Sequence, residues 1–260
     1  NIDQIIQLPK KPFKNSIAYI QGWVSLKKHH YDVVINSVRH SSSGKLSVQF
    51  ANSTYKLFGA DTLDIQFQEK DYGHVAKYSI YDLRSYLTRL GFPINNKPPA
   101  SLDLKLTPLE IAEGKKILNK LVNPQKKTIS LFTYATGEKC YSESWWAGFY
   151  ERLKTEYPNH NFIEVLPVEN ISKLSFKIPT FYSKDIREIG SFIANTEVFI
   201  GADSGIMHLA SSAHIPTVGL FSITDPITFQ PYNNNSVGIN TNISNTDACI
   251  EILNKIICRD

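Results

Sequence analysis

Short apolar strands alternate with helical patterns through the second half of the chain, and this alternation constrains the fold more than any other feature. Val198–Gly201 is a run typical of a buried strand, and a small-residue turn separates it from a helical pattern at Ile206–Ala213. Strands that alternate with helices form parallel sheets, so the chain is predicted to have an α/β fold. The other expected strands are Thr128–Phe132, Asn161–Leu166 and Pro216–Phe221, and the other expected helices are Trp145–Leu153, Asp185–Ala194 and Ile250–Ile257.

The first half shows a less regular version of the same pattern. Strands are expected at Tyr31–Asn36 and Tyr55–Gly59, and helices at Leu46–Ala51 and Ile80–Leu90. A further helix should begin after Thr107. This threonine can cap the free backbone N–H groups, Pro108 suits the first helical position, and Glu110 can complete a capping box.

A polar break at Pro124–Lys127 predicts a domain boundary. We therefore expect a first domain over residues 1–123 and a second over residues 124–260, with the final helix packing back on the first domain. The chain starts at Asn1 and enters an apolar run at once. We expect N-terminal residues to be missing from this sequence, which would leave the first domain incomplete.

Charge and cysteine usage narrow the possible partners. A formal net charge of +4 is too small to predict a nucleic acid partner, and it suits anionic ligands or an anionic membrane surface. Cys140, Cys249 and Cys258 show neither disulfide nor metal-ligand spacing, which favours a reducing cytoplasm. No apolar run approaches the length of a membrane span. No pair of carboxylates has the spacing of a metal site, so we expect no metal.

The turn Asp203-Ser204-Gly205 is the first candidate site. It joins a strand to a helix, and the first N–H groups of a helix have no internal partner and carry partial positive charge. Gly205 lets a ligand approach, so this terminus can bind phosphate at the strand ends, where ligands of open parallel sheets bind. Alternatively, Asp203 only caps the helix and Gly205 only makes a tight turn.

The next strand ends in a similar polar loop. Phe221 closes that strand, and Thr224-Asp225-Pro226 and Pro231-Tyr232 follow it. Together with Asp203-Ser204-Gly205-Ile206-Met207-His208-Leu209-Ala210, this segment resembles glycosyltransferase family 9, the ADP-heptose:lipopolysaccharide heptosyltransferases. The resemblance implies a GT-B type fold: two Rossmann-like domains with parallel sheets, the first binding the acceptor and the second the nucleotide sugar.

The resemblance also implies roles for single residues. The backbone at Ser204 and Gly205 would hold the donor diphosphate, and Asp203 and His208 would line the site. Alternatively, His208 is a packed core histidine. Phe221, Thr224 and Asp225 are the remaining donor-site candidates of this region.

Residues after two earlier strands complete the candidate site. Lys139 can neutralise charge on a departing diphosphate, and members of the family have a lysine in this loop, although it could also be a solvated loop lysine. Thr133 and Thr136 can add hydroxyl contacts to the phosphates. Glu169 follows a strand end and is expected to bind ribose hydroxyls.

The expected reaction is inverting transfer of heptose from ADP-heptose to a lipopolysaccharide core acceptor at the cytoplasmic face of the inner membrane, with no cofactor beyond the donor. The aspartate that serves the family as general base follows its first strand and has no counterpart here. Two alternatives stay open. One is another GT-B enzyme that uses a UDP-sugar, a transferase or an epimerase. The other is an inactive nucleotide-sugar-binding protein.

Overall fold

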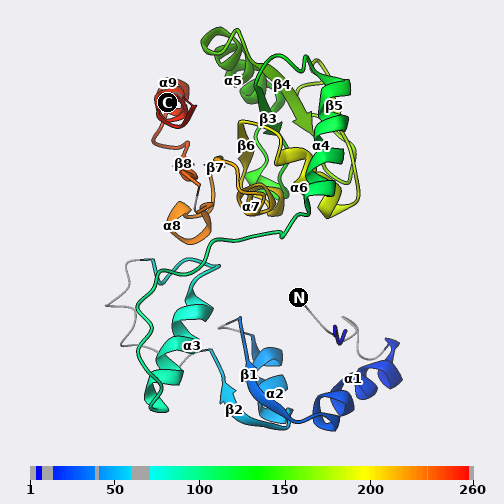
Figure 1. Cartoon of the computed structure of the whole chain (residues 1–260), viewed down its shortest axis with the longest axis vertical. Helices are drawn as coiled ribbons and strands as arrows, with labels where there is room; N and C mark the ends of the chain where they lie inside the picture. The colour runs from blue at the N-terminus through cyan, green and yellow to red at the C-terminus, as the bar shows by residue number, and fades with distance from the viewer. Residues whose placement is uncertain (1–3, 8–13, 39–40, 60–70, 233, 258–260) are drawn as a thin grey trace. The chain divides into compact units, whose positions relative to one another are not determined.

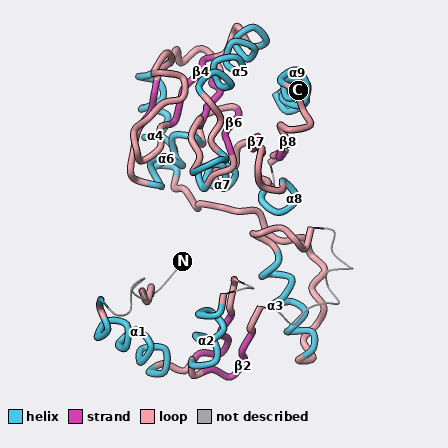
Figure 2. The backbone as a smooth tube through the Cα atoms, turned by 180° about the vertical axis from the view of Figure 1, so that it is seen from behind, coloured by secondary structure: helices cyan, strands magenta, loops and turns pink. Residues whose placement is uncertain are grey.

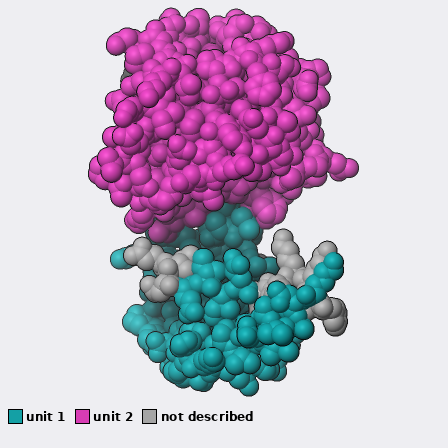
Figure 3. Space-filling model, turned by 90° about the vertical axis from the view of Figure 1, so that its right-hand side faces the viewer, with its two compact units in different colours: residues 1–99 teal, residues 100–260 magenta. Residues whose placement is uncertain are grey.

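The computed structural model describes residues 4–7, 14–38, 41–59, 71–232 and 234–257. The chain divides into two compact units, residues 1–99 and 100–260, which Figure 3 colours teal and magenta. The predicted boundary after residue 123 therefore lies inside the second unit. The polar break at Pro124–Lys127 is the connection from a helix of this unit to the first strand of its sheet.

Unit 1 contains a two-stranded parallel sheet in the part that is described. The paired strands are β1 (Tyr31–Ile35) and β2 (Ser53–Leu57), and the helices are α1 (Ser16–Lys28), α2 (Ser42–Phe50) and α3 (Tyr78–Arg89). The strands and helices predicted here are confirmed. Helix α2 begins four residues earlier than predicted, because the Ser41 side chain accepts a hydrogen bond from the Gly44 N–H at 3.0 Å and caps its first turn.

Unit 2 is built on a six-stranded parallel sheet with the order β5-β4-β3-β6-β7-β8. Its strands are β3 (Thr128–Phe132), β4 (Asn161–Val165), β5 (Thr180–Phe181), β6 (Val198–Ala202), β7 (Thr217–Phe221) and β8 (Val237–Asn240). The predicted strands and their parallel direction are confirmed. Strands β5 and β8 were not predicted, since they have only two and four residues.

Helices cover both faces of this sheet. One face packs against α5 (Glu143–Glu156) and α9 (Thr246–Ile257), and the other against α4 (Pro108–Leu121), α6 (Ile186–Ile193) and α7 (Gly205–Ser212). In Figures 1 and 2, α4 and α6 lie together on the flank of the sheet away from α9. Alternate strand residues face the two layers: Ile200 packs toward α5 and α9, whereas Phe199 packs toward α6 and α7.

Local signals in the sequence explain where two of these helices begin. Helix α4 starts with the predicted capping box, in which Thr107 and Glu110 satisfy each other's backbone N–H groups. The loop after β7 contains a short helix, α8 (Pro226–Phe229), that was not predicted. It begins there because Asp225 caps it and Pro226 suits its first position. Helix α9 packs against α5 inside unit 2.

Candidate functional site

The strand order of unit 2 defines a point where ligands of such sheets bind. From β3 the chain proceeds to β4 and β5 on one side, and then returns to β6 on the other side of β3. The loops after β3 and β6 therefore diverge from two adjacent strands and leave a crevice at their carboxyl ends. The sequence placed Thr136 and Lys139 in the first of these loops, and Asp203-Ser204-Gly205 in the second.

The turn after β6 leads directly into α7. Ser204 is its N-cap, and the Ser204 side chain accepts a hydrogen bond from the Met207 N–H at 3.4 Å. The cap is therefore Ser204, and the alternative in which Asp203 only caps the helix is wrong. A Cβ atom added at Gly205 would meet no atom within 4 Å. The start of α7 therefore faces open space, which an anion could occupy.

Asp203 joins two neighbouring loops. Its Oδ2 atom accepts a hydrogen bond from Lys139 Nζ at 3.2 Å and another from the Thr224 hydroxyl at 2.6 Å. Asp203 is 6% exposed, so this carboxylate is held by partners and not by solvent. The lysine is brought here by the short 3₁₀ helix Gly137–Lys139. Two separately predicted charged residues, Lys139 and Asp203, thus meet across the crevice between β3 and β6.

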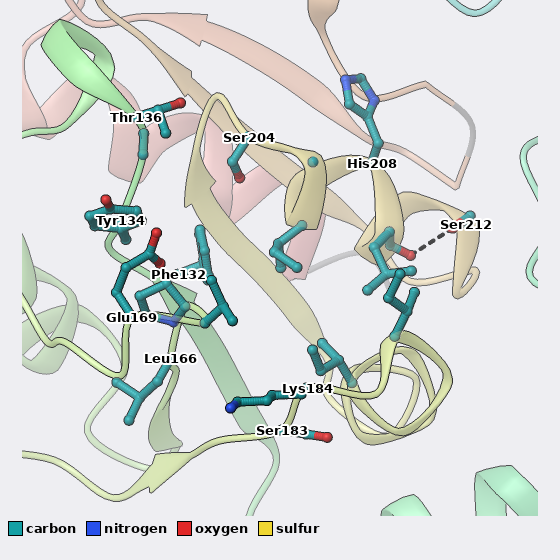
Figure 4. A pocket seen from close by; sticks show the side chains of 18 of the residues that line it. Phe132, Tyr134, Thr136, Leu166, Glu169, Ser183, Lys184, Ser204, His208 and Ser212 are labelled. Carbon is teal, nitrogen blue, oxygen red and sulfur yellow. Dashed lines mark hydrogen bonds between the residues drawn. The ribbon is translucent and has the colours of Figure 1, made fainter. Parts of the chain in front are cut away.

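A cavity of about 780 Å³ opens beside this pair. Six of the predicted residues line it: Thr136, Lys139, Glu169, Ser204, Gly205 and His208. Figure 4 shows Thr136, Ser204 and His208 along one edge of the cavity, Ser183 and Lys184 at the opposite edge, and Glu169 on the wall between them. Apolar side chains supply most of the remaining wall, among them Phe132, Leu166, Ile186, Ile189 and Leu209.

Besides Asp203, four predicted residues lie outside the cavity lining. Thr133 is 1% exposed, and its hydroxyl donates to the buried carboxylate of Glu164 while accepting from the Lys173 N–H at 3.1 Å. Phe221 is 1% exposed in the core. Thr224 reaches the site only through Asp203, and Asp225 accepts from the Ile227 N–H as the cap of α8. Direct ligand contacts by these four residues remain predictions that this geometry does not favour.

Sequence reasoning missed one wall of the cavity. Leu102, Asp103 and Leu104 precede α4, yet they line the cavity formed by the strand ends. Ser183 and Lys184, between β5 and α6, also line it and were not predicted. These two residues could have been predicted, because they follow a strand and precede Asp185, the N-cap of α6, and ligands bind at such strand ends.

The described residues contain neither a metal-binding cluster nor a helix that could span a membrane. Within that part of the chain, no three or more His, Cys, Asp or Glu side chains gather as metal ligands. Independence from metal remains a prediction. No described helix combines the length and the apolar character that are needed to cross a bilayer.

Sequence comparison supports the predicted resemblance in the C-terminal part of the chain. Residues 183–257 match the model of glycosyltransferase family 9 (heptosyltransferase). Lipopolysaccharide heptosyltransferase 3 of Escherichia coli is 38% identical over 50 residues, which are 19% of this chain and 15% of that protein. This match thus spans far less than two thirds of the curated relative.

Structure comparison extends over the whole chain. A glycosyl transferase family 9 protein from Veillonella parvula has a TM-score of 0.71 at 14% identity, over 100% of this chain and 83% of that one. Escherichia coli heptosyltransferase WaaC with ADP has a TM-score of 0.62 at 13% identity, over 98% and 84%. The Escherichia coli ADP-heptose LPS heptosyltransferase II has a TM-score of 0.60 at 14% identity, over 92% and 80%. The α/β fold of GT-B type is confirmed.

Proposed function

We propose that this chain, which is related to glycosyltransferase family 9, transfers heptose from ADP-heptose to a lipopolysaccharide core acceptor. One observation carries the proposal. A single cavity joins the start of α7 and Lys139 at one edge to a largely apolar space beyond them. A nucleotide sugar needs this combination, because its diphosphate is anionic and the flat faces of its base pack on apolar side chains.

The diphosphate belongs at the start of α7. The backbone N–H groups there lack intrahelical partners, and the open space at Gly205 admits phosphate oxygens. Lys139 contributes a full positive charge at the same edge, with Asp203 fixing its position at 3.2 Å. Such preorganised charge is worth most where negative charge develops during the reaction, which here is the leaving diphosphate.

The reaction that we propose inverts the configuration at the anomeric carbon of the sugar. An acceptor hydroxyl oxygen forms a bond to that carbon while the bond to the diphosphate oxygen breaks on the opposite face. The electron pair of the broken bond leaves with ADP, and the hydroxyl proton passes to a base that we do not assign. Since Lys139 and α7 offset the charge of the leaving group, we propose that transfer needs no metal, and chelation with EDTA should leave turnover unchanged.

Glu169 suits the ribose of the donor. Its carboxylate lies on the wall between the phosphate edge and the opposite edge of the cavity (Figure 4). Carboxylates after the second strand of a dinucleotide-binding sheet accept hydrogen bonds from ribose hydroxyls, and β4 holds that place in this sheet. An ADP-bound structure of a protein with the same fold supports adenine as the base.

The proposed acceptor places the protein in the cytoplasm at the inner face of the inner membrane. Support comes from the relative, which is named a lipopolysaccharide heptosyltransferase, and from the net charge of +4. Such a charge favours contact with anionic lipid headgroups.

A thermal-shift panel with ADP, UDP and GDP tests the donor, followed by a turnover assay with ADP-heptose. We expect ADP to stabilise the protein most and ADP-heptose to be consumed. A preference for UDP would instead support a GT-B enzyme that uses a UDP-sugar. Stabilisation by ADP with no consumption of ADP-heptose in the presence of acceptor would support an inactive nucleotide-sugar-binding protein.

A further inference from the structure

We infer that residues 100–107, here called the strap, form the wall that holds the nucleoside of the donor, and that Arg187 is the positioning residue that fixes this wall. The inference rests on the proposed function, because it takes the cavity to be the donor site. The strap has no regular secondary structure and connects the boundary of unit 1 to the start of α4. Its residues Leu102, Asp103 and Leu104 line the cavity.

The Arg187 side chain holds the strap by binding to backbone carbonyls of the strap. Its Nη1 atom donates to the Leu104 carbonyl at 3.0 Å, and its Nη2 atom donates to the Lys105 carbonyl at 3.0 Å. The same guanidinium binds Glu110 at the start of α4, with Nη2 to Oε2 at 2.8 Å. The planar guanidinium has enough N–H donors to bind both carbonyls and the carboxylate at once. A lysine ammonium does not have this planar arrangement of donors.

Two further contacts fix the strap to α7. The Leu104 N–H donates to the carbonyl of Ser212, the last residue of α7, at 3.0 Å. Asp103 contacts His214 just beyond that helix, with Oδ1 and Nε2 3.0 Å apart. These contacts hold the strap beside the C-terminal end of α7.

The position of the strap along α7 matches the length of a nucleotide. Ser212 lies seven residues after Gly205, which is roughly 10 Å along a helix axis. The cavity lining runs along α7 from Gly205 to Ser212 and includes Leu102 and Leu104, so a nucleoside that follows a diphosphate at the start of α7 has room to reach these two leucines. Ile186, Ile189 and Leu209 also line the cavity and supply apolar surface on which the faces of a base can pack.

Gly190 shows how closely the strap packs against α6. A Cβ atom at this position of α6 would lie 2.5 Å from the Leu104 side chain. Any larger residue must therefore move the Leu104 side chain. Gly190→Ala displaces the Leu104 side chain without replacing a residue of the cavity lining, and Gly148→Ala is a control on α5, where the added Cβ meets no atom within 4 Å.

The test compares the binding of ADP with the binding of inorganic pyrophosphate by calorimetry at one salt concentration. In Arg187→Ala and Gly190→Ala the Kd for ADP should rise roughly tenfold, while the Kd for pyrophosphate stays within about twofold of wild type. Arg187→Lys should show an intermediate loss for ADP. Gly148→Ala should bind both ligands as wild type does. If Gly190→Ala does not fold, Leu104→Ala takes its place with the same expectation.

The outcomes distinguish a failure of the strap inference from a failure of the proposed function. If wild type binds ADP but the strap variants bind it equally well, the strap inference is overturned and the proposed function is not. Equal losses for ADP and pyrophosphate also overturn it, since they show general damage and not a loss of nucleoside contact. Absence of ADP binding to wild type overturns the proposed function and the inference together.

Discussion

Lys139 Nζ lies 3.2 Å from Asp203 Oδ2, and this contact joins the loops that leave β3 and β6. The strands are adjacent in the sheet, but the chain proceeds from them to opposite sides. The contact therefore bridges the two sides of the crevice where a ligand of such a sheet binds. The side chains are 29% and 8% exposed, so the pair is partly shielded from water.

Replacing Lys139 with alanine should remove the positive charge at the leaving group. We expect turnover of ADP-heptose to fall about 100-fold to 1000-fold, the range found when one preorganised donor is removed from an active site. Steady-state kinetics measure this loss. Lys126→Ala, an exposed lysine at the other end of β3, should be neutral. Undiminished turnover in Lys139→Ala would reject the proposed role of this lysine.

Thr224 should affect catalysis only through its hydrogen bond to Asp203. Thr224→Val removes the hydroxyl that donates to Asp203 Oδ2 at 2.6 Å and leaves a nearly buried carboxylate with one partner fewer. We expect kcat/KM to fall roughly tenfold, since an unmet buried hydrogen bond costs about 1–3 kcal/mol. Thr224→Ser should restore most of the activity. A valine variant as active as wild type would show that Asp203 does not need this contact.

Gly205→Ala should separate binding from stability. The added methyl meets no protein atom, and alanine is favoured over glycine in a helix by up to about 1 kcal/mol, so the melting temperature should not fall. The methyl would stand where the phosphates approach α7, so the affinity for ADP should drop. Calorimetry and thermal melts measure both quantities. An alanine variant that binds ADP as tightly as wild type places the phosphates elsewhere.

Much of the secondary structure of unit 2 could be predicted from the sequence, because the signals for it lie within a few neighbouring residues. Buried strands, the capping box at Thr107 and the small-residue turn at Ser204–Gly205 depend on neighbouring residues only. The meeting of Lys139 with Asp203 also follows, since parallel strands bring their carboxyl ends to one edge of the sheet.

Other features depend on contacts that sequence patterns do not encode. The direction of the Thr133 side chain is set by Glu164, which is fully buried on β4 and takes the hydroxyl away from the cavity. The strap reaches the site through Arg187, more than 80 residues away in sequence. The domain boundary was placed at Pro124–Lys127 because a loop between a helix and a strand has the same polar composition as a linker.

Glu164 should make stability depend on pH. Burial raises the pKa of its carboxyl above the usual value of 4.5, although hydrogen bonds from Ser172 and Thr133 act in the opposite direction. For a raised pKa, the favourable contribution is complete below the unfolded-state pKa and is lost as the pH rises through the folded-state pKa. Glu164→Gln does not titrate, so the stability of wild type relative to this variant should decrease from about pH 4 upward.

Urea unfolding of both proteins over that pH range measures the difference. Glu151→Gln, the same replacement at an exposed position of α5, controls for the loss of one carboxylate. A difference between wild type and Glu164→Gln that grows in favour of wild type as the pH rises would contradict the assigned direction of the pKa.

A crystal structure with ADP bound tests the central claim most directly. We predict that the diphosphate oxygens lie within hydrogen-bond distance of the backbone N–H groups at the start of α7, with Lys139 Nζ beside them and the ribose toward Glu169. A nucleotide bound in another crevice, or α7 amides that make no contact with phosphate, would contradict the account.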